Sequence, residues 1–326
     1  MARDVTKPRR ALGTGDVVEP GDVIEAVGLT RHFGEVVAVD AIDLRVGEGE
    51  VVAVLGPNGA GKTTTLEMLL GLRRPTAGSV RVFGGDPTAA EVRGRVGAML
   101  QDTDAPDSLT VAEIVDLVAA YYPYRLPTPD VLERASLTGH RKRRVTQLSG
   151  GERQRLSFAL AIVGDPDLLY LDEPTASLDV GARRAFWRQV QDFAALGKTI
   201  LFSTHNLEEA DLVADRVVII NRGRIFSDST PRELKGLLAG RRLELVTDAD
   251  DGELAALPGV HAMSLLPPDA ATVAGPALRR VQLQATAAEP ALQALFASGR
   301  TVSGLIVTEA TLEEAFVHLT SAEAVR

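Results

Sequence analysis

The chain has 326 residues, enough for two domains, and its 45% hydrophobic and 24% charged residues are typical of a globular protein with a full core. A formal net charge of −9 disfavours bulk electrostatic binding to nucleic acid or to acidic lipid. The absence of cysteine from the sequence excludes a disulfide scaffold and thiolate metal sites, and it fits a reducing compartment.

Residues 1–20 predict a disordered polar tail. They mix Arg3, Arg9 and Arg10 with acidic residues and have no apolar core, so they do not resemble a signal peptide. No apolar run in the sequence approaches the roughly eighteen residues that a membrane span needs. We therefore expect a cytoplasmic protein that reaches a membrane only through a partner.

Short antiparallel strands are predicted after the tail. Apolar residues indicate strands over 23–27, 36–39 and 42–44, separated by glycines. The next apolar strand, 51–55, leads into a helix that carries leucines at helical spacing. Further strands are predicted over 78–83 and 96–100.

The pattern becomes helical from about residue 103 to 164. Thr110 is a candidate N-cap for the helix 111–120, a proline-rich interval interrupts the pattern, and a second helix is predicted over 131–137. Apolar strands then alternate with helices, which predicts a parallel α/β sheet with a helical insertion. These strands cover residues 168–171, 199–203 and 217–221.

A domain boundary is predicted near Gly240, between a first domain over 21–238 and a second over 240–326. The second domain shows the β-α-β-β-α-β order of a small α+β, ferredoxin-like fold. Its predicted elements are strand 242–246, helix 252–257, strands 260–265 and 279–285, helix 289–297, strand 301–307 and a closing helix 311–319.

The loop after strand 51–55 matches the phosphate-loop pattern G-x-x-x-x-G-K-[ST] in the strand–loop–helix context that this pattern requires. Its glycines allow a tight turn whose N–H groups point inward and form an anion site at the helix N-terminus. Lys62 is expected to bind the β- and γ-phosphates, and the Thr63 hydroxyl is expected to bind Mg²⁺. The predicted nucleotide-binding residues are Gly56, Pro57, Asn58, Gly59, Ala60, Gly61, Lys62, Thr63 and Thr64.

Two carboxylates follow the apolar strand 168–171. A buried strand can hold Asp172 rigidly near the Mg²⁺ of the phosphate loop, and Glu173 can then face the water that attacks the γ-phosphate. A strand that merely ends in a solvated acidic turn is the alternative, and the preceding phosphate loop makes it the weaker one.

A second anion-binding helix terminus is predicted at Leu148-Ser149-Gly150-Gly151-Glu152, with Glu152 in the first turn. One nucleotide does not need two such termini from one chain. Two chains arranged head to tail would place Ser149, Gly150 and Gly151 of one chain over the γ-phosphate bound by the other, and Glu152 is included with them among the residues predicted to bind this nucleotide in trans. With these motifs in order, residues 23–236 resemble the nucleotide-binding subunits of ABC transporters.

The resemblance implies an ABC ATPase fold, which is a P-loop NTPase with a RecA-like core, an antiparallel β subdomain and a helical subdomain. It implies that Phe33 stacks on adenine, where a tyrosine is commoner in the family. It further implies that Gln101 senses the γ-phosphate and is a Mg²⁺ ligand with Thr63 and Asp172. Ser177-Leu178-Asp179 matches the loop that contacts the partner chain, although the family more often has glycine in place of Ser177.

Hydrolysis of ATP is the activity that the resemblance implies. Glu173 is then the general base or water-orienting group, His205 is the switch histidine that clamps the γ-phosphate, and Lys62 with Mg²⁺ offsets the developing charge. Two ATP molecules sandwiched between two copies would close the dimer on binding and open it on hydrolysis.

The segment from Thr311 to Thr320 resembles the closing helix of ABC-2-type, drug-resistance (daunorubicin-resistance-like) exporter ATPases, with its apolar residues on one face. This resemblance implies a homodimer that powers export through a separate integral membrane permease of the ABC-2 type. The chain would then lie at the inner face of the cell membrane. Antibiotics, lipids and polysaccharides are candidate cargo.

A soluble ABC ATPase that acts on ribosomes or DNA is the alternative function. Such proteins usually carry two cassettes, coiled coils or zinc sites, and the sequence shows none of these. A phosphate-loop kinase would not need residues 148–152 or His205. The basic run 140–144 is interpreted as a solvated loop and not as a nucleic-acid site, because no aromatic residues interleave it.

Overall fold

The computed structural model describes residues 21–100, 106, 108–176, 178–237, 241–267 and 278–309. Packing divides the chain into two units, of which the first ends at Ser229 and the second begins at Thr230. Four predicted features lie outside the described residues, namely the tail 1–20, Gln101, Ser177 and the closing helix 311–319.

The first unit is built around a six-stranded sheet with the strand order β5-β6-β7-β3-β8-β9. Its neighbouring strands are parallel except for the antiparallel pair β8 and β9. Every residue of β3, β6 and β7 is buried, which explains the continuous apolar runs of the sequence. The strands are β3 (Val51–Leu55), β5 (Val96–Met99), β6 (Leu168–Asp172), β7 (Thr199–Ser203), β8 (Arg216–Asn221) and β9 (Arg224–Ser229).

A three-stranded antiparallel sheet with the order β2-β1-β4 belongs to the same unit. The sequence predicts separate strands over 36–39 and 42–44, and this prediction is wrong. One strand covers both, because the chain passes Ala41 with a φ of 51° and stays paired with β1 on either side. The strands are β1 (Ile24–Phe33), β2 (Val36–Val46) and β4 (Ala77–Val82).

Helix α1 (Lys62–Leu69) packs on both sheets, and its Leu66 shares a buried cluster with Ile24 of β1 and Tyr170 of β6. Burial raises the pKa of the Tyr170 hydroxyl, so this group stays neutral in the core. The short helix α2 (Ala90–Arg93) precedes β5. Because α1 is fixed against two sheets, its N-terminus is a rigid place for a loop that binds a ligand.

Aromatic side chains fill the contact between α5 (Gly150–Ile162) and α6 (Val180–Ala194). The rings of Phe158 and Phe186 meet edge to face with their centroids 5.2 Å apart, and Trp187 continues the contact to Phe202 of β7 at 4.6 Å. This cluster ties α5 and α6 to the central sheet. Helix α7 (Leu207–Val213) lies between β7 and β8 in the sequence.

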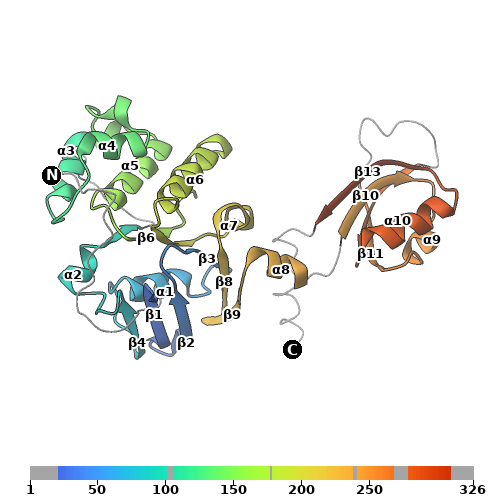
Figure 1. Cartoon of the computed structure of the whole chain (residues 1–326), viewed down its shortest axis with the longest axis horizontal. Coiled ribbons are helices and arrows are strands. Elements are labelled where there is room, and N and C mark those ends of the chain that lie inside the picture. Colours follow the sequence, from blue (N-terminus) through green and yellow to red (C-terminus); the bar gives the residue numbers. More distant parts are fainter. Residues whose placement is uncertain are drawn as a thin grey trace. The chain divides into compact units, whose positions relative to one another are not determined.

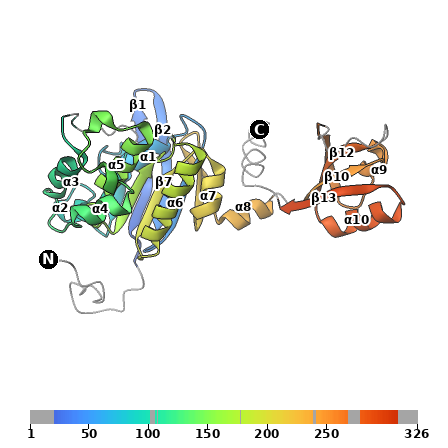
Figure 2. The same cartoon turned by 90° about the horizontal axis from the view of Figure 1, so that it is seen from above.

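Helices α3 (Val111–Ala119), α4 (Thr128–Arg134) and α5 lie side by side and form the predicted helical insertion (Figures 1 and 2). Thr110 is the N-cap of α3, as predicted, in a capping box with Glu113. The second helix begins at Thr128 and not at residue 131. Pro129 lies in its first turn, where a missing N–H group breaks no helical hydrogen bond. Two short 3-10 turns, Thr138–His140 and Val145–Gln147, connect α4 to α5.

The second unit contains a four-stranded antiparallel sheet with the strand order β11-β12-β10-β13. One face carries buried Leu243, Leu245, Val281 and Leu283, which form a core with Leu254 of α9 and Leu295 of α10. The other face carries charge, since Glu244 lies 3.3 Å from Arg280. The elements are α8 (Pro231–Leu237), β10 (Arg241–Thr247), α9 (Asp251–Ala255), β11 (Val260–Leu265), β12 (Arg279–Ala285), α10 (Ala288–Ala297) and β13 (Val302–Glu309).

Across the described parts of both units, the helices are too short or too polar to span a lipid bilayer. The division at Ser229 also places α8 in the second unit, whereas the sequence predicts the boundary near Gly240.

Candidate functional site

The loop between β3 and α1 is held close to its neighbours. A Cβ atom at Gly56 would collide with the carbonyl oxygen of Ile220 in β8, and one at Gly61 would collide with that of Ala38 in β2. Gly59 and Gly61 also have φ angles of 78° and 103°, a region that side chains disfavour. The predicted glycine positions are therefore required by two nearby strands and by the backbone itself.

The N-terminus of α1 carries no side-chain cap, because its N-cap residue is Gly61. The loop folds back on itself through a hydrogen bond of 3.1 Å from Ala60 N to Pro57 O, and Gly223 N donates to Ala60 O at 2.9 Å. Pro57, Asn58 and Gly59 are exposed above this anchor. An uncapped helix terminus under an exposed glycine-rich arc is suited to an anionic ligand.

Lys62 lies beneath the loop with only 6% of its surface exposed. Its Nζ donates hydrogen bonds to Gly56 O at 2.8 Å and to Pro57 O at 3.3 Å. Burial lowers the pKa of this ammonium group, and the negative charges of Glu173 and Asp172 act in the opposite direction. One positive charge and two negative charges therefore meet under the phosphate loop.

The two carboxylates at the end of β6 have different environments. Asp172 is buried and accepts a hydrogen bond from the Ser203 hydroxyl of β7. The backbone N–H of Glu173 donates to Ser203 O at 3.2 Å and to Ser203 Oγ at 3.0 Å. Glu173 adopts a left-handed backbone with a φ of 46°, which turns it out of the strand at a cost on the order of 1 kcal/mol.

His205 follows β7 and faces Glu173, with 3.0 Å between its Nδ1 and Glu173 Oε2. The imidazole is 62% exposed, whereas the Glu173 side chain is 17% exposed. A histidine in this position can donate a hydrogen bond to the carboxylate and keep its other nitrogen toward a ligand. The structure therefore brings together two residues that lie 32 positions apart in the sequence.

Glu209 of α7 is a buried residue of the site that the sequence analysis missed. Its carboxylate accepts hydrogen bonds from the hydroxyls of Thr175 and Thr204, the latter at 2.7 Å, and lies 3.3 Å from Arg183. The two threonines stand beside Glu173 and His205 in the sequence, so one carboxylate fixes the loops of both. The only signal was a helix N-terminus with two glutamates, which is usually solvated.

A cavity of about 770 Å³ joins these parts. Its lining combines the phosphate loop with the two residues that follow β6 and β7. It comprises Ala38, Asn58, Gly59, Ala60, Gly61, Lys62, Thr63, Thr64, Glu173 and His205. Phe33 is not in this lining. It stands at the end of β1, 41% exposed, with the guanidinium carbons of Arg31 and Arg73 at 4.9 Å and 5.1 Å from its ring centre.

The segment Ser149–Glu152 forms the N-terminus of α5, as predicted, with Ser149 as N-cap in a capping box with Glu152. Ser149 and Gly150 are exposed, and none of these four residues is among those that line the 770 Å³ cavity. One chain therefore does not bring this terminus to its own phosphate loop.

The loop residues before α6 have roles within the chain. The Asp179 carboxylate caps α6 by accepting from Ala182 N at 2.8 Å. Leu178 is buried and lies next to Gly151, where a Cβ atom would come within 3.3 Å of Leu178 Cδ2. The loop and the N-terminus of α5 are thus neighbours in one chain.

The basic run 140–144 is only partly the solvated loop that the sequence predicts. Arg141, Lys142 and Arg144 are exposed, but His140 and Arg143 both contact Glu152. The interpretation as a purely solvated loop is therefore wrong at these two positions. Sequence reasoning missed the contact because the loop and α5 are adjacent only after folding.

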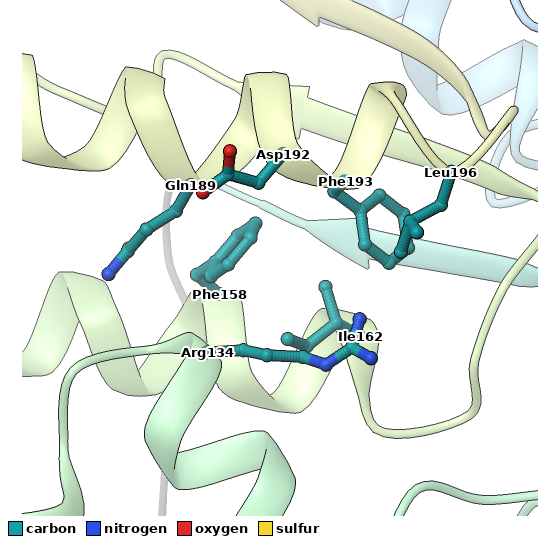
Figure 3. Close-up of a pocket in the computed structure, with 7 residues that line it drawn as sticks. All are labelled: Arg134, Phe158, Ile162, Gln189, Asp192, Phe193 and Leu196. Atoms are coloured by element: carbon teal, nitrogen blue, oxygen red, sulfur yellow. The ribbon is translucent and has the colours of Figure 1, made fainter.

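A smaller pocket of about 270 Å³ lies between α4, α5 and α6 (Figure 3). Phe158 and Phe193 form its apolar walls, and Arg134, Gln189 and Asp192 provide polar groups. Phe158 also belongs to the aromatic contact between α5 and α6. The lining of this smaller pocket contains none of the predicted site residues, so we interpret the pocket as a groove between packed helices.

A glycine-rich loop between a parallel strand and a helix, with a buried lysine and two carboxylates beside it, defines a phosphate-loop nucleotide-binding protein. Comparisons with known proteins identify the family. A family model described as "ABC transporter" matches residues 39–176.

Two relatives illustrate the match. The chain is 35% identical over 307 residues to the daunorubicin resistance ATP-binding protein DrrA3 of Streptomyces coeruleorubidus, covering 90% of this chain and 94% of that protein. It is 40% identical over 222 residues to the Nod factor export ATP-binding protein I of Paraburkholderia xenovorans strain LB400, covering 66% of this chain and 73% of that protein.

Solved structures show the same fold. An ATP-binding subunit of an ABC transporter superposes with a TM-score of 0.61 at 27% identity, covering 66% of this chain and 92% of that one. A dimeric bacterial ABC transporter cassette superposes with a TM-score of 0.59 at 25% identity, covering 64% of this chain and 98% of that one. The chain belongs to the ATP-binding proteins of ABC transporters, matches the drug-resistance type of exporter ATPase, and is itself an ATPase.

Proposed function

We propose that two copies of this chain bind two ATP molecules head to tail and power a separate ABC-2-type membrane permease. The observation that carries the proposal is the separation of the two anion-binding termini. The cavity at the phosphate loop has no lining residue from Ser149–Glu152, and Ser149 and Gly150 are exposed. A second copy would supply the missing donors to the γ-phosphate. The dimeric cassette at 25% identity supports this arrangement.

The residues at the cavity fit ATP with Mg²⁺. In nucleotide sites Mg²⁺ takes one or two protein oxygens and completes its octahedron with phosphate oxygens and waters. The exposed Thr63 hydroxyl and the buried Asp172 carboxylate are oxygen donors of this kind, and Asp172 is close enough to Lys62 to influence its pKa. Gln101 is a further proposed ligand outside the described residues. When bound, Mg²⁺ would neutralise phosphate charge.

The remaining chemistry is assigned to side chains of the chain. Glu173 accepts the proton of an attacking water or orients that water toward the γ-phosphate. His205, at 3.0 Å, holds the Glu173 carboxylate and presents its other nitrogen to the phosphate. Lys62 exchanges its hydrogen bonds to Gly56 and Pro57 for phosphate oxygens. Phosphoryl transfer needs positioning and charge neutralisation more than covalent chemistry, and these groups supply both.

Phe33 is the proposed platform for the adenine. Its exposed ring lies at the end of β1, and Arg31 and Arg73 beside it keep the ring in place. Arg73 Nε donates a hydrogen bond of 2.6 Å to Glu67 Oε2, which fixes the guanidinium beside the ring. Leu178 and Asp179, with Ser177 outside the described residues, are proposed to meet the partner chain.

The second unit is proposed to be a ferredoxin-like accessory domain. Its element order and its strand order β11-β12-β10-β13 support this assignment. The two relatives have names that state drug resistance and Nod factor export, and this supports export as the direction of transport. We place the chain at the cytoplasmic face of the membrane, held there by the permease. Antibiotics, lipids and polysaccharides remain the candidate cargo.

An affinity purification from the native host tests the proposal. Tagged Glu173→Gln, which should bind ATP without hydrolysing it, would be extracted with mild detergent and its partners identified by mass spectrometry. We expect a stoichiometric membrane protein with several spans. Recovery of ribosomal or DNA-associated proteins instead would reject export and leave the ATP site unaffected.

A further inference from the structure

The carboxylate of Glu152 is divided between two sets of donors. Its Oε2 accepts from the backbone N–H of Ser149 at 2.7 Å. Its Oε1 lies 2.9 Å from Arg143 Nη1 and 2.8 Å from His140 Nε2. The side chain is 14% exposed, so these contacts replace most of its water. Both oxygens are therefore turned back toward the loop that precedes α5.

The donors of this carboxylate are fixed by other elements. The carbonyl of Arg143 accepts a hydrogen bond from Val111 N at 2.9 Å. Thr110 and Arg144 form an isolated antiparallel β-bridge, so the loop is attached to the start of α3. The Arg143 guanidinium also donates to Gln147 O. Arg143 is thus held at both its backbone and its side chain, and it can position Glu152 in the first turn of α5.

The capping box leaves the outer side of this terminus available. Ser149 Oγ accepts from Glu152 N at 3.3 Å, so its hydroxyl hydrogen is available for another acceptor. Gly150 is exposed, with no atom near the place where a Cβ would stand. Ser149 and Gly150 are thus the exposed part of this terminus, while the carboxylate of the same turn contacts the preceding loop.

Charge decides whether an anion can use these donors. A carboxylate in the first turn strengthens an isolated helix, but it repels a phosphate that approaches the same terminus. The pKa of Glu152 is lowered, first by the Ser149 backbone hydrogen bond and further by Arg143 and His140, so the group is charged at neutral pH. Without a nearby cation, the terminus would carry an uncompensated negative charge.

We propose that Arg143, assisted by His140, is a positioning residue that neutralises and retracts Glu152, so that Ser149, Gly150 and Gly151 can donate hydrogen bonds to the γ-phosphate held by a second copy of the chain. This inference rests on the proposed head-to-tail dimer and adds to it the residues that set the charge of the α5 terminus. It also gives a role to two members of the basic run 140–144.

ATP-driven dimerisation measures the effect. In the Glu173→Gln background, the ATP concentration for half-maximal dimer is determined by analytical ultracentrifugation of the full chain. We expect Arg143→Ala to raise it by about tenfold or more, in keeping with the loss of a charge-assisted hydrogen bond. Lys142→Ala is the matched control, because it removes the same charge from an exposed neighbour in the same loop.

A double variant separates charge from shape. If Arg143 acts by neutralising Glu152, then Arg143→Ala with Glu152→Gln recovers dimerisation to within about threefold of the Glu173→Gln parent, because the uncharged amide needs no cation. If Arg143 only shapes the loop, the two changes add and no recovery occurs, which overturns the inference. Thermal unfolding and fluorescent-nucleotide binding by the monomer confirm that each variant is folded.

The other outcomes are also decisive. If the Glu173→Gln parent forms a dimer with ATP and Arg143→Ala dimerises at the same ATP concentration as Lys142→Ala, the inference is rejected and the proposed function stands. A parent that binds ATP and stays monomeric at every concentration rejects the head-to-tail dimer, and the inference with it.

Discussion

Glu173 and His205 meet across two neighbouring strands, with 3.0 Å between Glu173 Oε2 and His205 Nδ1. Each follows the carboxyl end of a buried strand, β6 or β7, and these strands pair in parallel. The pair lines the same cavity as the phosphate loop. The sheet therefore sets the distance between the proposed base and the phosphates.

Replacing His205 with alanine should remove the side chain that contacts and orients the Glu173 carboxylate. We expect kcat to fall by about 100-fold or more, the order of effect of a positioned acid–base group, with KM for ATP changed little. Steady-state phosphate release measures both constants. His261→Ala, an exposed histidine of β11, is the control. Normal kcat in His205→Ala would remove His205 from the mechanism.

Gly61→Ala should abolish nucleotide binding, because the new methyl group would collide with the Ala38 carbonyl and the φ of 103° disfavours alanine. Gly84→Ala tests the backbone effect alone. Gly84 has a φ of 74° with open space around it, so we expect a loss of stability of about 1 kcal/mol and normal binding. Titration with a fluorescent nucleotide compares the two. Equal affinities would show that the close approach to β2 is unimportant.

The pH dependence of nucleotide binding should reflect Lys62. Burial lowers the pKa of its ammonium group, so the charge that binds phosphate is lost as pH rises through a value below the ordinary 10.5. The charge of Glu173 opposes this effect. The Glu173→Gln variant should therefore lose its affinity for nucleotide at a lower pH than the unchanged chain does. Nucleotide affinities of both proteins measured from pH 7 to pH 10.5 test this difference. Coincident pH profiles for Glu173→Gln and the unchanged chain would contradict the prediction.

Glu209→Gln should weaken both the fold and the reaction. The amide cannot replace the charge that faces Arg183 while also accepting from both threonines. We expect the free energy of unfolding in urea to fall by about 1–3 kcal/mol and kcat to fall as the two loops loosen. Glu208→Gln, at the exposed neighbour, should change neither. A fully active, fully stable Glu209→Gln variant would show that the buried carboxylate positions nothing.

A chain that ends at Ser229 should bind nucleotide with the affinity of the full chain. All residues that line the cavity lie in the first unit, and packing divides the chain at this point. Isothermal titration with a slowly hydrolysed ATP analogue provides the measurement. Loss of binding by a folded fragment would mean that the second unit contributes to the site.

The buried strands were predictable because both of their faces are covered. Strand 199–203 of the prediction has the bounds of β7, and 168–171 lacks only Asp172 of β6. The antiparallel sheet was harder. Gly28, with a φ of 58°, ends a predicted strand, yet β1 passes through it as an irregularity and continues to Phe33. A glycine in a strand and a glycine in a turn have the same local signal.

The phosphate loop was predictable from its own local motif, Glu173 from the strand and the phosphate loop that precede it, and His205 as a site residue only through the family resemblance. Glu209 and the contacts of Arg143 were not. A buried glutamate is recognised only by partners that arrive from elsewhere, here Thr175 and Arg183. Arg143 and Lys142 are neighbouring basic residues in the sequence, and only the fold shows that Arg143 contacts Glu152 while Lys142 is exposed. Folding assigns these roles, and residue type does not.

The left-handed backbone of Glu173 has a consequence for directed evolution of this enzyme. Glycine relaxes at a φ of 46°, whereas every other residue type is strained there to some degree. A screen that selects survivors of heating should therefore enrich glycine at position 173, and a screen that selects turnover should eliminate it. The two selections are incompatible at a single codon, as expected where a reactive group occupies a conformation that the fold would otherwise avoid.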